Sequence, residues 1–257
     1  MAGVKQERDG GVGILTLDEP DSLNAMTPDL LGGLAAAIAE MTGEGGVRAL
    51  VLTGAGRAFC SGQNLKAAQA LGPDLLAGVM RHYWPAFKAL RECRVPVVVA
   101  VNGVAAGGGF SLALAGDIIV AARSASFIQV FSRIGLVPDL GSTWMLPRVV
   151  GRQRALELML LNEPLSAEAA ERMGLVRSVV DDGQLREEAL TLARRLADGP
   201  TRALVATRQL LEVSEHATFE EQFRHELEAQ SEIRTSADAL EGRAAFVEKR
   251  KARFTGR

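Results

Sequence analysis

The hydrophobic residues of the chain gather in short continuous runs, which are typical of strands buried on both faces. Val97–Val101 is the clearest run, and Ala49–Thr53 is a second one. Near the N-terminus, Val4–Arg8 and Val12–Leu17 flank the turn sequence Asp9-Gly10-Gly11, which predicts a β-hairpin. Further extended segments are expected at Asp117–Ala121, Ser126–Phe131 and Val176–Val180.

Helical patterns separate these runs. Thr27-Pro28 has the form of a helix start, with Thr27 as the cap, and this helix should reach Met41. The other helices expected before residue 200 are Asp74–Cys93, Gly151–Leu161, Ser166–Met173 and Gly183–Ala197. Strands that alternate with helices predict an α/β fold with parallel strand pairing.

The last part of the chain has a different pattern, because strand signals cease after Gly199. Three further helices are expected there, at Thr201–Ser214, Thr218–Ser231 and Ser236–Lys251. A helical tail of this length usually needs a partner surface to cover its apolar stripe. We therefore expect a core domain over residues 1–199 and a helical region over residues 200–257.

A glycine-rich turn follows the central strand. Asn102 and Gly103 turn the chain, then Gly107, Gly108 and Gly109 precede a stretch with helical character. The first turn of a helix has backbone N–H groups without internal partners, and glycine lets a ligand approach them closely. The turn therefore suits an oxygen atom that carries or acquires negative charge. The alternative is a tight turn that serves packing only. Spacing alone does not distinguish this turn from one that binds an oxygen atom.

Composition narrows the class of protein. The 257 residues fit one large domain, or one domain with an appendage, and a hydrophobic share of 47% supports a sizeable core. The net charge of −2 gives no argument for binding nucleic acid or an anionic membrane. No apolar run is long enough to span a bilayer, and the N-terminus lacks the apolar core of a signal peptide.

The residues with reactive side chains point to no metal or disulfide. Two cysteines, Cys60 and Cys93, do not make a disulfide framework, so a cytoplasmic location is expected. Cys60 has no histidine partner in sequence, which favours packing over nucleophilic chemistry. His82 is interpreted as a partly buried packing residue. No His, Cys and Asp cluster has metal-ligand spacing, so no metal site is expected.

Three motifs coincide with those of a known family. They are Gly54-Ala-Gly-Arg-Ala-Phe-Cys-Ser-Gly-Gln-Asn-Leu65, Ala100-Val-Asn-Gly-Val-Ala-Ala-Gly-Gly-Gly-Phe-Ser111 and Gly135-Leu-Val-Pro-Asp-Leu-Gly-Ser-Thr-Trp-Met-Leu-Pro147. With the tail Ala245–Lys251, they make nearly the whole chain resemble the crotonase superfamily, the enoyl-CoA hydratase/isomerase family. The first and third motifs look closest to the phenylacetate-pathway isomerases, which rearrange a ring-epoxide acyl-CoA and shift double bonds in unsaturated acyl-CoAs.

The resemblance implies a fold, an assembly and a reaction centre. The fold is a crotonase spiral of ββα units with a C-terminal helical trimerisation region, and the assembly is a homotrimer or a homohexamer. No cofactor is implied, because CoA arrives as part of the acyl-CoA substrate. The backbone N–H groups of Gln63 and Gly108 match the two that bind the thioester oxygen in this family. Removing a proton beside a thioester carbonyl moves charge onto that oxygen, and two fixed donors stabilise the enolate.

The acidic residues favour an isomerase. Hydratases of the family use two glutamates to activate water, and the corresponding positions here are Ser111 and Phe131. Asp139 stands where the isomerases place a single carboxylate. One base that lifts a proton from one carbon and returns it to another is enough to move a double bond. Asp139 is therefore expected to be the proton shuttle.

Alternatives stay open at this point. The sequence around Asp139 also suits a turn or a helix cap. The rival functions are a hydratase of low activity, which activates water with Asp139 alone, and a non-catalytic acyl-CoA-binding scaffold. Desolvation should raise the pKa of Asp139 if its apolar neighbours line the pocket. These neighbours are Leu136, Val137, Leu140 and Trp144.

The resemblance also implies residues that contact the substrate. Asn64 and Ser142 depart from the more usual Asp and Gly of the family. Phe246 and Lys249 match tail positions that reach CoA, commonly on a neighbouring subunit. The expected substrate and CoA contacts are Ser22, Asn24, Ala25, Ser61, Gly62, Gln63, Asn64, Leu65, Gly107, Gly108, Phe246 and Lys249.

Overall fold

The computed structural model describes residues 3–43 and 45–257, and strand pairing divides its core into two sheets. The six-stranded sheet has the order β1-β2-β3-β5-β7-β10, and the four-stranded sheet has the order β4-β6-β8-β9. The hairpin of β1 (Val4–Asp9) and β2 (Val12–Leu17) is antiparallel, whereas all other pairs in the large sheet are parallel. Both features confirm the sequence prediction. The other strands are β3 (Ala49–Gly54), β4 (Ala58–Cys60), β5 (Val97–Val101), β6 (Val104–Ala106), β7 (Ile118–Ala122), β8 (Ser126–Ile128), β9 (Leu165–Ser166) and β10 (Ser178–Val180).

The first helices follow the sequence signals with one correction. Helix α1 (Pro28–Met41) has the predicted cap, in which the Thr27 side chain accepts a hydrogen bond from the Leu30 N–H. The predicted continuous helix over residues 74–93 is wrong, because two helices, α2 (Leu75–His82) and α3 (Trp84–Arg91), meet at Tyr83. Pro85 lies in the first turn of α3, where a proline is tolerated but cannot continue the preceding helix.

Helix α4 (Gly108–Leu114) begins inside the glycine triplet rather than after it. The three-residue strand β6 separates this triplet from the Asn102-Gly103 turn and was not predicted. The remaining helices are α5 (Ser142–Val150), α6 (Arg152–Leu161), α7 (Ala167–Arg172), α8 (Leu185–Ala197), α9 (Thr201–Ser214), α10 (Phe219–Ile233) and α11 (Ala237–Val247), with 3-10 turns η1 (Pro20–Ser22), η2 (Ala67–Leu71), η3 (Phe131–Ile134) and η4 (Asp182–Gln184).

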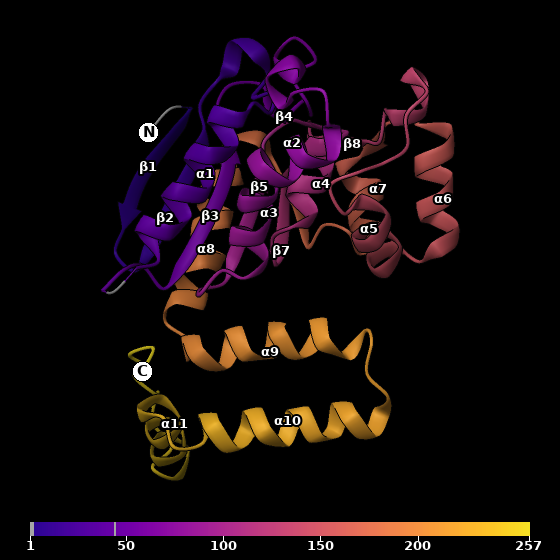
Figure 1. Ribbon diagram of the computed structural model, residues 1–257. Helices are drawn as coiled ribbons and strands as arrows, with labels where there is room; N and C mark the ends of the chain where they lie inside the picture. The colour runs from indigo at the N-terminus through magenta and orange to yellow at the C-terminus, as the bar shows by residue number, and fades with distance from the viewer. Residues whose placement is uncertain (1–2, 44) are drawn as a thin grey trace.

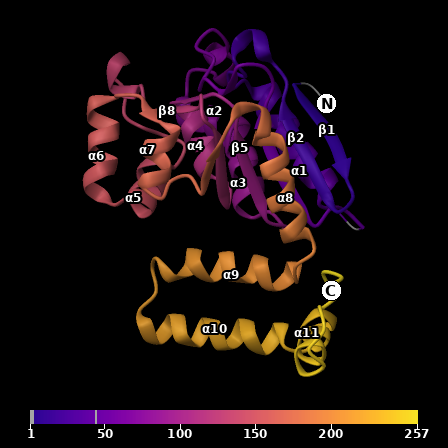
Figure 2. The ribbon, with the colours of Figure 1, turned by 180° about the vertical axis from the view of Figure 1, so that it is seen from behind.

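Helices cover both faces of the large sheet. Helices α1 and α3 lie on one face (Figure 1), and α8 crosses the other (Figure 2). Every residue of β5 is buried between these layers. This explains why the central strand is a continuous apolar run rather than an alternating one.

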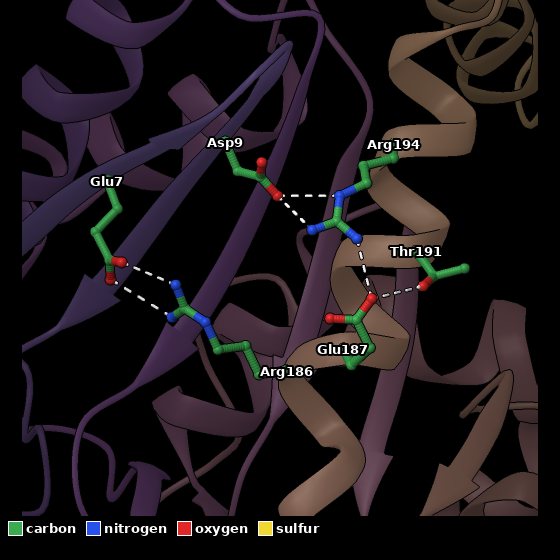
Figure 3. Close-up of polar contacts among 6 residues, drawn as sticks. All are labelled: Glu7, Asp9, Arg186, Glu187, Thr191 and Arg194. Carbon is green, nitrogen blue, oxygen red and sulfur yellow. Dashed lines mark hydrogen bonds and ion pairs between the residues drawn. The ribbon is translucent and has the colours of Figure 1, made fainter.

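Ion pairs join α8 to the edge strand β1 (Figure 3). The Arg186 guanidinium lies 2.8 Å from the Glu7 carboxylate, and the Arg194 guanidinium lies 2.6 Å from that of Asp9. Exposed ion pairs contribute about 1 kcal/mol or less each. The buried Ala and Leu face of α8 is therefore the main source of its attachment to the sheet.

The last three helices extend away from the sheets (Figures 1 and 2). Residues 198–200 separate α8 from α9, at the predicted limit between core and tail. Arg48, just before β3, donates hydrogen bonds to the Thr201 side chain and to the Phe254 carbonyl, and so ties both ends of the tail to the core. Phe219 and Phe246 are each 86% exposed. Across residues 3–43 and 45–257, no helix combines the length and apolar character needed to cross a membrane.

Candidate active site

Two backbone segments press against each other beyond the carboxyl ends of β4 and β6. Residues 61–65 follow β4, and residues 107–109 open α4. A Cβ atom on Gly62 would lie 2.7 Å from the Ala106 oxygen and 3.3 Å from the Gly108 nitrogen. A Cβ atom on Gly109 would overlap the Cys60 carbonyl. Glycine at both positions is what allows the two segments to approach so closely.

This approach makes neighbours of the Gln63 and Gly108 N–H groups. The Met26–Gln63 bridge uses the Met26 N–H, which donates to Gly62, and the Asn64 N–H, which donates to Met26. The Gln63 N–H therefore faces away from Met26. Gly108 is the first residue of α4, so its N–H has no acceptor within the helix. Neither N–H donates a hydrogen bond to any other residue that the structure describes.

Asp139 lies in the connection from η3 to α5, and this connection is tied to α4. The Asp139 carbonyl accepts hydrogen bonds from the Ser111 hydroxyl at 3.2 Å and from the Ser142 N–H at 3.0 Å. The Leu140 side chain would lie 2.9 Å from a Cβ atom on Gly108. The structure thus brings the predicted base to the same end of α4 as the predicted donors.

The Asp139 side chain is exposed in the single chain, but neighbouring protein atoms still displace part of its water. This burial raises the pKa of the carboxyl group above its usual value, against the effect of a hydrogen bond from its own backbone. The predicted direction is confirmed. The predicted cause is wrong in part, because Leu136 and Val137 are 55% and 79% exposed, and only Leu140 lies beside the glycines.

Trp144, the other apolar neighbour considered, has a different surrounding. Two guanidinium groups lie near its ring, with Arg91 at 5.0 Å and Arg148 at 4.1 Å from the ring centroid. These are cation–π distances. Arg91 belongs to α3 and Trp144 to α5, so this contact links the two helices, while the partly buried Trp144 side chain also packs against the hydrophobic core.

The two positions that hold glutamates in the family's hydratases carry no acid here. Ser111 is fully buried, and Phe131 is buried with its ring tip 3.7 Å from a Cβ position on Gly107. No charged group of the described chain contributes to the pKa shift of Asp139. Asp139 is therefore the acid carried by the connection that the Ser111 hydroxyl ties to α4. Within residues 3–43 and 45–257, no group of three or more His, Cys, Asp or Glu side chains could hold a metal ion.

Sequence reasoning did not identify Tyr83 as a site residue. Its side chain is buried, and its hydroxyl donates a 3.2 Å hydrogen bond to the Met26 carbonyl. Burial raises the pKa of Tyr83, a hydrogen bond with the Gln63 side chain lowers it, and the negative charge of Asp139 raises it again. The hydroxyl is thus within electrostatic reach of both predicted site residues. The available signal was a single tyrosine placed two residues before Pro85.

Cys60 behaves as predicted. It is fully buried, and this burial raises the pKa of its thiol to about 12. A thiol with this pKa stays protonated at neutral pH and is a poor nucleophile. His82 ends α2 and is half-buried.

The loop from Ser22 to Ala25 lies beside residues 61–65, because the Ser61 N–H donates to the Leu23 carbonyl at 3.0 Å. The Asn24 side chain is fully buried and donates to the carbonyls of Ala55 and Ala58. Asn24 therefore holds the loop in place with its side chain, and since its N–H donates to the Glu19 carbonyl at 2.9 Å, it leaves only its own carbonyl for a ligand. Contact between this loop and CoA stays a prediction.

The remaining predicted residues separate into two places. Asn64 caps the turn after the Gln63 amide by accepting the N–H groups of Lys66 and Ala67, and Leu65 is 66% exposed. Helix α11, which carries Phe246 and ends two residues before Lys249, lies on the far side of α9 from the sheets (Figures 1 and 2). Within one chain, the structure does not bring Phe246 and Lys249 to the Gln63 amide.

The chain is similar in sequence and in structure to several known proteins. It is 45% identical to the 1,2-epoxyphenylacetyl-CoA isomerase of Escherichia coli over 251 residues, which cover 96% of each chain. It is 43% identical to a probable enoyl-CoA hydratase of Rhodobacter capsulatus, over 99% of this chain and 98% of that one. A crystal structure of enoyl-CoA hydratase from Mycobacterium tuberculosis H37Rv superposes with a TM-score of 0.91 at 33% identity and covers 100% of both chains.

These likenesses extend over the whole fold, including the helical tail. The family model for enoyl-CoA hydratase/isomerase matches residues 7–257, which include both amide donors, Asp139 and all three tail helices. The expected α/β spiral with its C-terminal helices is thereby confirmed. The chain belongs to the enoyl-CoA hydratase/isomerase family and has the crotonase fold.

Proposed function

We propose that the protein is an acyl-CoA isomerase that moves a double bond, or rearranges a ring epoxide, through an enolate. The observation that carries this proposal is the single carboxylate of Asp139, on a connection tied to α4 beside the two free amides. Ser111 and Phe131, at the hydratase glutamate positions, cannot act as a general acid or base near neutral pH. Water activation by a pair of acids is therefore not available to this site.

The proposed steps use three groups of the chain. The thioester oxygen accepts hydrogen bonds from the N–H groups of Gln63 and Gly108. The Asp139 carboxylate then removes a proton from a carbon of the acyl chain, and the electron pair of the broken C–H bond moves onto the thioester oxygen. The carboxylic acid returns the proton to a different carbon, the enolate collapses, and the double bond has moved. Each amide donor is expected to contribute about 10²–10³ in rate.

The raised pKa of Asp139 suits this role. A carrier must accept a proton in one step and release it in the next, and it does both best when its pKa lies near the working pH. Partial desolvation moves the Asp139 carboxyl in that direction from its usual value. A fully solvated aspartate would be a weaker base by comparison.

We propose an aryl acyl-CoA of phenylacetate catabolism as the substrate, with fatty acyl-CoA catabolism as the alternative. Support comes from the 45% identical relative, whose name is 1,2-epoxyphenylacetyl-CoA isomerase. The relative at 43% identity carries the name of a probable enoyl-CoA hydratase. This keeps a hydratase of low activity, in which Asp139 alone activates water, as the second candidate.

One experiment separates these functions. The purified protein is incubated with a 3-enoyl-CoA and, separately, with a 2-enoyl-CoA, and products are followed by absorbance and mass. Conversion of the 3-enoyl to the 2-enoyl compound without a change in mass supports the isomerase. A gain of one water supports the hydratase, and binding without turnover supports the non-catalytic scaffold. The ring epoxide of phenylacetyl-CoA is the third substrate in the series.

We further propose a homotrimer or homohexamer in the cytoplasm. The tail helices expose large apolar side chains that a neighbouring copy would cover, including Phe219, Phe223 and Phe246. In such an assembly, Phe246 and Lys249 would reach the CoA of a neighbouring subunit. Light scattering coupled to size-exclusion chromatography tests the assembly, because a monomer near 27.3 kDa would contradict it.

A further inference from the structure

Met26 connects both amide donors. Its backbone N–H donates to the Gly62 carbonyl at 2.7 Å, and its carbonyl accepts the Asn64 N–H at 3.0 Å, so it holds the backbone on either side of Gln63. The end of its side chain packs directly against Gly108, with the sulfur 3.7 Å from the place of a Cβ atom. A shift of Met26 would therefore change the position of one donor relative to the other.

Tyr83 supplies a further hydrogen bond to Met26. The phenol hydroxyl donates to the Met26 carbonyl at 3.2 Å, which gives this carbonyl two donors. Met26 is fully buried and Tyr83 is 1% exposed, so no water is at hand to replace the phenol. A buried carbonyl that loses one of its donors is free to tilt toward the other.

The break between α2 and α3 holds this phenol in place. The Tyr83 N–H donates to the Val79 carbonyl at 2.8 Å, and its own carbonyl accepts the Ala86 N–H at 3.1 Å. Tyr83 is therefore the C-cap of α2 and also the N-cap of α3. Both helices fix its backbone, so its hydroxyl reaches Met26 from a rigid base.

We propose that Tyr83 is a positioning residue, which sets the separation of the Gln63 and Gly108 N–H groups by fixing Met26 between them. This proposal rests on the proposed function, because the separation matters only if both amides bind one oxygen. Donors to a developing oxyanion are effective only when they are held at hydrogen-bond distance before the charge forms. Small displacements of such groups reduce rates strongly.

The ionisation state of the phenol agrees with this role. Burial raises the pKa of Tyr83 from its usual value, and the negative charge of Asp139 raises it too. The hydroxyl therefore keeps its proton throughout the neutral range and remains a donor. Deprotonation of Asp139 during turnover strengthens this preference instead of competing with it.

The test is the variant Tyr83→Phe, which removes one oxygen atom and leaves the ring. A substrate labelled with ¹³C at the thioester carbonyl is bound to each protein, and infrared difference spectra give the carbonyl stretching frequency. We expect the wild-type protein to lower this frequency and Tyr83→Phe to lower it less. The kcat should fall about 10-fold in the variant, with KM changed less than about twofold, because ground-state contacts to CoA stay in place.

A second variant and a control keep the result interpretable. Met26→Leu keeps the backbone hydrogen bonds but changes the contact with Gly108, and it should reduce the carbonyl shift as well. The double variant should be little worse than the worse single variant, because both changes act on the same residue. Trp84→Phe alters the same helix junction at an exposed residue and should leave the frequency and kcat unchanged.

The outcomes separate this proposal from the one it rests on. If the wild-type protein binds the thioester without lowering its carbonyl frequency, the oxyanion site itself is refuted, and the role of Tyr83 with it. If the wild type lowers the frequency and Tyr83→Phe matches it in frequency and kcat, only the role of Tyr83 is refuted. A rise in KM at unchanged frequency also refutes it, because Tyr83 would then bind the ground state.

Discussion

The Ser111 hydroxyl donates a 3.2 Å hydrogen bond to the backbone carbonyl of Asp139. Ser111 lies fully buried on the second turn of α4, at a position where the hydratases of the family have a glutamate. In this chain the same position supports the connection that carries the proposed base. The position that would hold a hydratase glutamate therefore supports the connection that carries the base of the isomerase that we propose.

Replacing Ser111 by alanine should reduce turnover. Loss of this hydrogen bond should cost about 1 kcal/mol of stability and let the Asp139 connection move away from the amide donors. We expect kcat to fall several-fold in isomerisation of a 3-enoyl-CoA.

Ser236→Ala is the matched control, because Ser236 is also buried and its side chain caps α11 by accepting the Ala239 N–H. That variant should lose a similar amount of stability and keep its kcat. Equal kcat in the two variants would show that Ser111 has no role beyond packing.

Asp139→Asn should abolish most isomerase activity without harming the fold. The amide cannot take a proton from carbon, and loss of a general base commonly costs about 10²–10⁴ in rate. The structure also predicts that thermal stability is kept or raised, since partial burial of the carboxylate disfavours its charged form. Activity and melting temperature of the same preparation test both statements. Full activity in Asp139→Asn would exclude Asp139 as the base.

The pH dependence follows from the raised pKa of Asp139. The first step needs the carboxylate, so kcat/KM should fall as pH decreases through the pKa of the free protein. This acidic limb should lie above the usual aspartate pKa of about 3.9. The free energy of unfolding should change in the opposite direction to kcat/KM. A group whose pKa is raised in the folded state stabilises the fold at low pH, and this contribution is lost as pH rises. An acidic limb of kcat/KM at or below the usual aspartate pKa would show that desolvation does not raise the pKa of Asp139.

Gly62→Ala tests the close approach of the two donor segments. A Cβ atom there would lie 2.7 Å from the Ala106 oxygen, on a residue with φ of 91°. Since backbone atoms must move to make room, we expect the Gln63 and Gly108 amides to separate and kcat to fall by about 10² or more. Gly72→Ala is the control, because φ is 79° there and nothing lies within 4 Å of the new atom. Both variants carry backbone strain, so a loss of activity confined to Gly62→Ala isolates the contact.

Local pattern was enough to predict the elements with strong periodicity or clear caps. The hairpin β1–β2, the Thr27 cap and the bounds of α9 all follow from residues close in sequence. Of the small sheet only β8 was anticipated, within the extended segment expected at Ser126–Phe131, because the strands of this sheet are two or three residues long. Their pairing brings distant segments together, and Gly103 and Gly109 allow the close backbone approach there.

The site residues also divide into those that local sequence motifs identify and those that only distant contacts reveal. Gln63, Gly108 and Asp139 were identified from motifs that resemble a family, and the structure brings these residues to one end of α4. Tyr83 was missed because its contact with Met26 joins residues 57 apart in sequence across a helix break that a single proline produces. The exposure of Leu136 and Val137 was missed because an apolar residue in a loop has no periodicity that shows which way it faces.

Arg208 joins the tail to the core at a second place, apart from the contacts of Arg48. Its guanidinium lies 3.0 Å from the Asp117 carboxylate, just before β7, and also donates to the carbonyls of Cys93 and Val95. Asp117 in turn accepts the Val97 N–H at 2.7 Å. Burial raises the pKa of Asp117, and the positive charge of Arg208 is the largest opposing effect. Helix α9 is therefore held at the amino ends of β5 and β7 by a largely buried pair.

Arg208→Ala should cost about 3 kcal/mol of stability at neutral pH, because it leaves the Asp117 carboxylate without its partner. Without Arg208 the pKa of Asp117 should rise further. The loss should therefore be largest above that pKa and should shrink as acid neutralises the carboxyl group. Arg202→Ala removes an exposed pair between α9 and α10 and should cost about 1 kcal/mol or less at any pH. Chemical denaturation of both variants at several pH values tests this. Equal losses, or a loss from Arg208→Ala that does not change with pH, would mean that the Asp117 pair does not secure the tail.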